Sequence, residues 1–236
     1  MRWLIIPDIH DKIVRANRII QEEPHDRLLL MGDYFDDFQT GVTDAADTAL
    51  QVRKWLEAPS VTCLLGNHDV SYGWGRLNRR FLCAGYEPAK CIVIHGALKD
   101  HHWRSFHLHA WLDGGERPWL VTHAGFHPAW LRDVPPEGYR ARIDALCAEA
   151  WDSLLRGEHH SLLGCGASRF GEQEIGGLTW MDWSELIPMP GLNQLTGHTP
   201  ARKVRYKETP ESMNICLDTN LLHYAVFENG RLEIKA

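Results

Sequence analysis

The sequence has 236 residues, of which 44% are hydrophobic and 24% are charged, and its formal net charge is −6. This is the composition of an ordinary globular protein, and the length predicts a single domain over residues 1–236. The acidic balance argues against a general nucleic-acid-binding protein, whose surface is normally basic. It does not exclude a phosphorylated substrate, because bound divalent cations would reverse the local field.

The cysteines and the first residues bear on the cellular compartment. The six cysteines include no C-x-x-C pair and have no regular spacing. They therefore predict free thiols in a reducing compartment rather than disulfides or a zinc site. The apolar run Trp3–Ile6 is too short for a signal peptide or a membrane span. We expect a cytoplasmic protein with no membrane partner.

Short apolar runs that end in polar residues recur along the chain. In chain order they are Trp3–Ile6, Arg27–Met31, Val61–Leu65, Trp119–Thr122, Leu192–Thr196 and Asn214–Leu217. Runs of this length bounded by turn residues predict strands buried on both faces. The turn residues Asp113–Glu116 lie between Phe106–Leu112 and Trp119–Thr122, which predicts a hairpin.

Three stretches between these runs have helical character. They are Ile13–Glu22, Thr43–Glu57, which Thr43 could cap, and Pro136–Arg156. Strands that alternate with helices predict an α/β fold. Because the later strands resemble hairpins, we expect mixed β-sheets packed as a β-sandwich and flanked by helices.

Polar side chains follow the predicted strands at the ends where open α/β sheets bind their ligands. Those that carry metal-binding chemistry are Asp8, His10, Asp33, Asn67, His123 and His198. Carboxylate, imidazole and amide-oxygen donors together suit divalent manganese, iron, zinc or nickel. Any one of these fragments is common by chance, but several in order after strands are specific. The pattern predicts a metal site.

The same motifs resemble those of the calcineurin-like metallophosphoesterases. The resemblance is carried by Asp8-Ile-His10, Gly32-Asp33-Tyr-Phe-Asp36, Gly66-Asn67-His68-Asp69, His123-Ala-Gly125 and Gly197-His198-Thr199. Within that superfamily the chain is most similar to the phosphoprotein-phosphatase branch. This branch includes bacterial and phage serine/threonine phosphatases and symmetrical diadenosine-tetraphosphate hydrolases. The resemblance extends from residue 8 to about residue 219.

The resemblance implies a centre of two divalent metal ions, with manganese expected and iron, zinc or nickel as alternatives. The first ion would bind Asp8, His10 and Asp33, and the second would bind Asp33 as a bridge together with Asn67, His123 and His198. A water between the ions would attack phosphorus, since two ions lower the pKa of a bridging water and neutralise the developing charge. His68 would protonate the leaving oxygen and would be oriented by Asp36.

Two residues depart from the branch pattern. Asp37 stands where the branch usually has an arginine that grips the substrate phosphate, and Asp11 stands where the first motif usually has glycine. Extra carboxylates repel a dianionic phosphate, so another cation should compensate. The candidates are Arg76, Arg79, Arg80, Arg169 and Arg202. We favour Arg169, which lies in a glycine-rich loop, with Arg76 as a second phosphate-binding candidate beside Asn67.

Two further features allow more than one interpretation. The histidine-rich stretch Asp100–His109 could hold another metal ion, but His107 and His109 alternate on a predicted strand, and the ligands that the resemblance implies are already accounted for. Several of the ten tryptophans are near the motifs in sequence, namely Trp74, Trp103, Trp111 and Trp130. They could stack a nucleotide base, although packing in the core is the simpler interpretation.

The predicted function is that of a phosphomonoesterase that releases phosphate from a phosphoprotein or a small phosphomonoester. The first alternative is a dinucleoside polyphosphate or phosphodiester hydrolase, because the same metal ligands serve that reaction. The second alternative is a binding module that has lost catalysis, but all the expected ligands and His68 are present. The expected partner is a phosphorylated substrate, either a phosphoprotein or a nucleotide.

Overall fold

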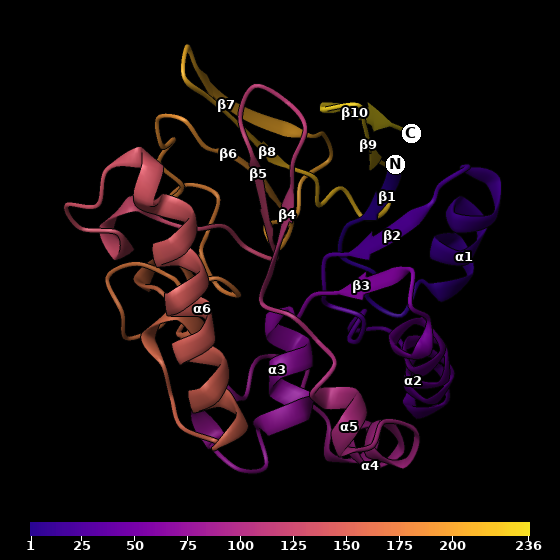
Figure 1. Cartoon of the computed structure of the whole chain (residues 1–236). Helices are drawn as coiled ribbons and strands as arrows, with labels where there is room; N and C mark the ends of the chain where they lie inside the picture. Colours follow the sequence, from indigo (N-terminus) through magenta and orange to yellow (C-terminus); the bar gives the residue numbers. More distant parts are fainter.

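The computed structural model describes residues 1–236 and contains two five-stranded β-sheets (Figure 1). The strands of the first sheet are β1 (Arg2–Ile6), β2 (Arg27–Leu30), β3 (Val61–Cys63), β9 (Tyr224–Glu228) and β10 (Arg231–Lys235). Their order is β10-β9-β1-β2-β3. Strands β1, β2 and β3 are parallel, whereas β9 is antiparallel to both of its neighbours.

The second sheet is also mixed. Its strands are β4 (His109–Leu112), β5 (Trp119–Thr122), β6 (Asn193–Thr196), β7 (Arg205–Thr209) and β8 (Ser212–Cys216). They follow the order β4-β5-β6-β8-β7. Strands β5, β6 and β8 are parallel, and the edge strands β4 and β7 are antiparallel to their neighbours.

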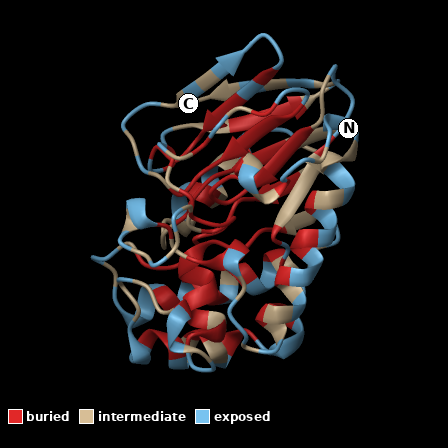
Figure 2. Cartoon of the chain, turned by 90° about the vertical axis from the view of Figure 1, so that its left-hand side faces the viewer, coloured by how far each residue is buried: buried red, intermediate tan, exposed pale blue.

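The two sheets pack face to face, which confirms the predicted sandwich. Side chains alternate along a strand, so Ile5 of β1 points to one face of the first sheet and Leu4 to the other. Ile5 belongs to a buried cluster that includes Val121 and Leu195 of the second sheet. Leu4 belongs to a larger cluster that includes Ala49 of the neighbouring helix α2 (Val42–Glu57). Figure 2 shows the buried strands in red in the upper part of the molecule, with partly exposed helices beside and below them.

The helices flank this sandwich as expected. They are α1 (Ile13–Glu22), α2, α3 (Asn67–Trp74), α4 (Pro88–Ala97), α5 (Asp100–Trp103) and α6 (Tyr139–Leu155). In Figure 1, α1 and α2 lie beside β1–β3, and α6 lies on the side of β4 and β5. No helix combines the length and apolar character needed to cross a membrane. All six cysteines are unpaired.

Several local predictions need correction. Thr43 does not cap α2, because the helix begins one residue earlier and its first turn is closed by Asp44, which accepts a hydrogen bond from Gly41 N at 2.9 Å. The predicted hairpin forms between β4 and β5, but β4 begins at His109 rather than Phe106. His107, two residues earlier, instead forms an isolated parallel bridge with Leu64 just after β3, and its N–H donates to Cys63 O at 2.9 Å.

Candidate metal centre

The loops that follow β1, β5 and β6 meet at one edge of the sandwich. The His198 N–H donates to Asp8 Oδ1 at 2.8 Å, although the two residues are 190 positions apart in the sequence. The Gly197 N–H donates to the His123 carbonyl at 2.6 Å. These hydrogen bonds hold together three segments that are distant in the sequence. The polar residues therefore meet at the carboxyl ends of the strands, where the sequence predicted a ligand site.

The backbone of this edge is strained at the side chains that matter. His10, Asp33 and His198 have positive φ angles of 45°, 48° and 66°. Non-glycine residues in this region cost about 1–3 kcal/mol each and persist where the surroundings enforce them, often at ligand sites. A Cβ at Gly66 would collide with the Asp33 carboxylate, and one at Gly197 would collide with that of Asp8. Glycine at these positions therefore permits close approach to two predicted ligands.

Two groups of side chains bring potential metal-ligand atoms within 4.8 Å of one another. The first group is Asp8, His10 and Asp33, and the second is Asp33, His123 and His198. Asp33 belongs to both groups, which is the position a bridging carboxylate must have. The Asn67 Oδ1 lies 3.3 Å from His123 Nε2 and so adjoins the second group. The structure thus brings all six predicted ligands together.

The orientation of His123 is that of a metal ligand. Its Nδ1 lies 3.0 Å from the Met31 carbonyl, which can only accept a hydrogen bond, so Nδ1 carries a proton. In the neutral ring Nε2 then has a lone pair, and this atom lies 3.3 Å from Asp33 Oδ2, 3.3 Å from Asn67 Oδ1 and 3.2 Å from His198 Nδ1. Asp33 Oδ2, Asn67 Oδ1 and the lone pair of His123 Nε2 are acceptors that converge with no hydrogen-bond donor between them, and such an arrangement fits a bound cation.

The first group fits a cation in the same way. His10 Nδ1 donates to the Phe35 carbonyl at 3.0 Å, which directs Nε2 toward Asp33 Oδ2 at 3.7 Å. Asp8 Oδ2 is buried and has no hydrogen-bond partner. An unpaired buried carboxylate oxygen costs free energy unless a cation or a proton satisfies it. The donor set in both groups therefore suits divalent metal ions.

The pKa shifts show that the centre requires positive charge. Burial disfavours the charged imidazole, but Asp33 and Asp8 outweigh burial and raise the pKa of His123 to about 9. Burial would raise the pKa of Asp33, but His123, His68 and His10 lower it. Burial and the neighbouring Asp218 both raise the pKa of Asp8 well above its ordinary value. The buried carboxylates of Asp33 and Asp8 thus favour the protonated form of His123, and a bound metal ion would supply the same positive charge.

His68 and Asp36 form the contact that the sequence predicted for them. His68 Nδ1 lies 3.0 Å from Asp36 Oδ2, which leaves Nε2 free. Burial disfavours the charged His68 ring, but the carboxylates of Asp33 and Asp36 outweigh it and raise the pKa of His68 well above its ordinary value. A histidine held in its protonated form by a carboxylate is suited to donate a proton.

Tyr72 and Lys90, which the sequence did not single out, donate hydrogen bonds to the oxygen of Asp36 that does not contact His68. The carboxylate of Asp36 is fully buried. Its Oδ1 accepts hydrogen bonds from Tyr72 Oη at 2.7 Å and from Lys90 Nζ at 3.3 Å. Lys90 is itself 1% exposed. A buried lysine of this kind stabilises a buried carboxylate and fixes the direction of its other oxygen.

The centre opens into a cavity of about 390 Å³. Arg169 lines this cavity, whereas Arg76 is exposed and does not. Arg79, Arg80 and Arg202 do not line it either. The Arg169 Nε lies 2.8 Å from Asp182 Oδ2, an ion pair that holds its guanidinium in place. Of the arginines considered from the sequence, the structure therefore brings only Arg169 to the centre.

The carboxylate of Asp37 is balanced by a lysine rather than left facing the substrate. Lys12 Nζ lies 2.9 Å from Asp37 Oδ2, and both residues line the cavity. A larger open groove of about 690 Å³ lies beside α1 and is lined by residues such as Val14, Ile19 and Leu222. It contains none of the predicted ligands.

Sequence reasoning missed two acidic residues of the centre. Asp218 follows β8 and lines the cavity, and the polar residue after an apolar run was the signal for it. Asp69 is fully buried and accepts backbone hydrogen bonds from Gly66, Asp33 and Tyr34 at 2.7–3.0 Å. It ties the loop after β2 to the start of α3, a role with no sequence signal beyond its place beside Asn67.

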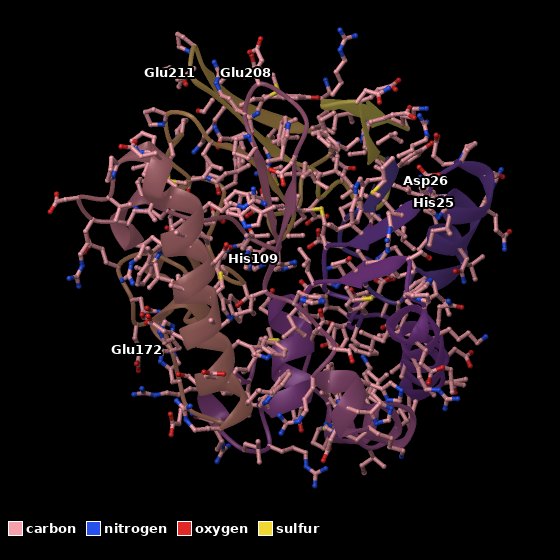
Figure 3. All side chains as sticks on the ribbon, in the orientation of Figure 1. His25, Asp26, His109, Glu172, Glu208 and Glu211 are labelled. Carbon is pink, nitrogen blue, oxygen red and sulfur yellow. The ribbon has the colours of Figure 1, made fainter.

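The histidine-rich stretch does not form a second cluster of metal ligands. The groups with metal-binding geometry are confined to the centre described above. His102 Nε2 pairs with Glu57 at 3.1 Å, and His109 Nε2 pairs with Asp144 of α6 at 2.8 Å. Figure 3 shows His109 between β4 and α6. None of the four tryptophans considered for base stacking lines the cavity; instead Trp180 does.

Fold and site together define a metal-dependent phosphoester hydrolase. The family model of the calcineurin-like phosphoesterases matches residues 1–202, and the chain belongs to this family. Members use a dinuclear divalent metal centre, and the ligand residues described above are candidates for it. No curated protein sequence is similar enough to this chain to count as a match.

The fold is supported by the first of three similar solved structures. A cold-active protein-tyrosine phosphatase of the psychrophile Shewanella sp. has a TM-score of 0.62 and 17% identity, with 99% of this chain and 77% of that chain covered. A metallophosphoesterase from Sphaerobacter thermophilus has a TM-score of 0.49 and 19% identity, over 99% of this chain and 87% of that chain. A serine/threonine phosphatase from Saccharomyces cerevisiae, similar to human PP5, has a TM-score of 0.48 and 15% identity, over 100% and 79%.

Proposed function

We propose that this enzyme is a phosphomonoesterase of the phosphoprotein-phosphatase branch, acting on a phosphoprotein or a small phosphomonoester. The observation that supports this most is the placement of two ligand groups that share Asp33 beside the paired side chains of His68 and Asp36. Such a site can hold a phosphate, activate water and protonate a leaving oxygen within one cavity.

The proposed ligands are those predicted from the sequence, and manganese is the proposed metal. Asp8, His10 and Asp33 would hold the first ion, and Asn67, His123 and His198 would join Asp33 at the second. When bound, the two ions would supply Lewis acidity and a water with a lowered pKa. The carbonyls of Met31 and Phe35 accept hydrogen bonds from Nδ1 of His123 and His10, which leaves the Nε2 atoms available as ligands.

The remaining roles belong to side chains around the phosphate. Arg169 binds the phosphate through the part of its guanidinium that Asp182 leaves free, and Asn67 contributes its amide. His68 donates the proton on Nε2 to the leaving oxygen. Asp36 accepts from Nδ1 and so keeps the ring protonated and aimed.

A dinucleoside polyphosphate or phosphodiester hydrolase is the alternative function, because the same ligands serve it. The monoesterase is preferred because Gly32-Asp33-Tyr-Phe-Asp36, His123-Ala-Gly125 and Gly197-His198-Thr199 resemble the motifs of the phosphoprotein-phosphatase branch. The cytoplasm is the proposed compartment, and six unpaired cysteines support it.

A substrate panel with metal-loaded protein tests the proposal. After loading with Mn²⁺, the enzyme is assayed against p-nitrophenyl phosphate, bis(p-nitrophenyl) phosphate, a phosphopeptide and diadenosine tetraphosphate. Monoesters should be cleaved with the highest kcat/KM. Preferential cleavage of the diester or the tetraphosphate would replace the proposal by its alternative. Parallel loading with iron, zinc or nickel ranks the metals by kcat.

A further inference from the structure

Most residues that line the cavity are polar, but its apolar side chains gather beside His68. Cys83 Sγ lies 3.6 Å from His68 Nδ1, and Ala84 follows it along the cavity wall. The ring of Phe38 meets the ring of His68 edge to face, with centroids 5.7 Å apart and planes at 86°. The fourth apolar residue, Trp180, lies against His198 instead.

Phe38 is placed in an unusual way for a large apolar side chain. It is 65% exposed, and its φ angle is 63°. A phenylalanine with positive φ is held there by its surroundings at an energetic cost. One side of the Phe38 ring lies close to Gly85, where a side chain would come within 3.0 Å of the ring. Phe38 and residues 83–85 thus form one continuous surface, the apolar wall.

The apolar wall lies where the leaving group of a phosphate ester must be, if the proposed function holds. His68 then protonates the oxygen that leaves, so the atoms attached to that oxygen lie next to His68. Phe38 is the apolar side chain whose ring meets the His68 ring, whereas Cys83 Sγ lies at the Nδ1 edge of that ring. The phosphate would then lie against the proposed metal ligands, which line the same cavity as Arg169.

We propose that the apolar wall selects phosphate esters with an aromatic leaving group, and that Phe38 is the residue that determines this specificity. The substrate class is aryl phosphates, which includes phosphotyrosine side chains. An aromatic ring that packs against Phe38 covers its exposed face and gains a favourable ring–ring contact. The short side chain of phosphoserine ends at the reacting oxygen and does not extend along Phe38. This inference rests on the proposed monoesterase function.

Matched peptides test the inference. Metal-loaded wild-type enzyme is assayed with two peptides of the same sequence, one containing phosphotyrosine and the other phosphoserine. The wild type should prefer the phosphotyrosine peptide. Phe38→Ala should lower kcat/KM for that peptide about 3–10-fold, mainly through KM, and leave the phosphoserine value unchanged, because one ring–ring contact is lost. The kcat/KM of Phe38→Leu for the phosphotyrosine peptide should lie between those of the wild type and Phe38→Ala.

Phe170→Ala is the matched control. Phe170 also has a φ angle of 63° and is fully exposed, but it does not line the cavity, so both kcat/KM values should stay at the wild-type level. Equal loss on both peptides in Phe38→Ala, or a wild-type preference for phosphoserine, would overturn the inference while leaving the monoesterase intact. Failure of the monoesterase proposal is distinct, since the wild type would then cleave bis(p-nitrophenyl) phosphate or diadenosine tetraphosphate with a higher kcat/KM than either phosphopeptide.

Discussion

Two buried clusters of charged residues in this protein differ in how their oxygen atoms are satisfied. At the far end of α1, Glu23 Oε1 accepts from Arg2 at 2.6 Å, and Oε2 accepts from Tyr224 at 2.9 Å, with Lys235 near both oxygens. In the metal centre, by contrast, Asp8 Oδ2 has no partner. A cluster whose atoms are all paired holds the fold together, whereas unpaired atoms that converge indicate a ligand.

The backbone makes the same distinction. Glu23 follows a regular helix with an extended φ of −97°, whereas Asp33 and His198 have positive φ angles. Strain is stored where the ligand is to bind and is absent where the charges only stabilise the fold. The comparison predicts that changes at the centre reduce activity and that changes at Glu23 reduce stability.

Removal of the shared ligand should have the largest effect. Asp33→Asn should lower kcat about 10⁴-fold, since a carboxylate that bridges two ions is lost and the ions contribute several kcal/mol to the transition state. Asparagine tolerates the positive φ at this position, so the fold should persist. Added Mn²⁺ should raise the Tm of the wild type and not that of the variant. A variant that still binds two ions would refute the bridging role of Asp33.

His68→Asn should lower kcat about 10³-fold, because the proton for the leaving oxygen is no longer supplied. Its metal content, measured by elemental analysis, should equal that of the wild type. Loss of metal from this variant would instead reassign His68 as a ligand. The result separates a residue that acts on substrate from the residues that hold the ions.

Arg169→Met should lower kcat/KM about 10–100-fold through a higher KM, since a charge-assisted hydrogen bond to phosphate is lost. Arg169→Lys should recover part of the lost kcat/KM, because lysine supplies the positive charge but cannot form two parallel hydrogen bonds to phosphate. Arg76→Met should leave kcat/KM unchanged, because Arg76 is exposed and outside the cavity. The opposite ranking of Arg76 and Arg169 would show that the loop of Arg169 does not bind the phosphate.

Glu23→Gln should leave kcat unchanged and lower the free energy of unfolding at pH 7 by about 1–2 kcal/mol, since charged hydrogen bonds are weakened. Burial opposes ionisation, but Arg2, Tyr224 and Lys235 lower the pKa of Glu23. Stability from the ionised group is therefore complete above its ordinary pKa of 4.5 and is lost as the pH falls through the lowered value. Urea unfolding at pH 7 and pH 3 should show the difference between the two proteins shrink in acid.

The fold class and the residues that converge at the metal centre were predictable because their signals are local. Each predicted strand is an apolar run followed by its polar residue, and the alternation along β1 already assigns Leu4 and Ile5 to opposite faces. Besides the short helix α3, the helices α4 and α5 were not predicted, and His101 and His102 of the histidine-rich stretch belong to α5. Their mixed composition has no clear period, and packing against α2 and α3 decides their structure.

The sequence by itself determined which residues are candidates to hold the metal ions, since the residue types and their order after strands are encoded in short segments. Only the tertiary structure decided what surrounds them. It brought Arg169 rather than Arg76 to the cavity, paired Asp37 with Lys12, and placed Lys90 behind Asp36 and Phe38 beside His68. Lys90 and Asp36, for example, are 54 positions apart in the sequence. Such contacts follow from the packing of whole elements rather than from any local pattern.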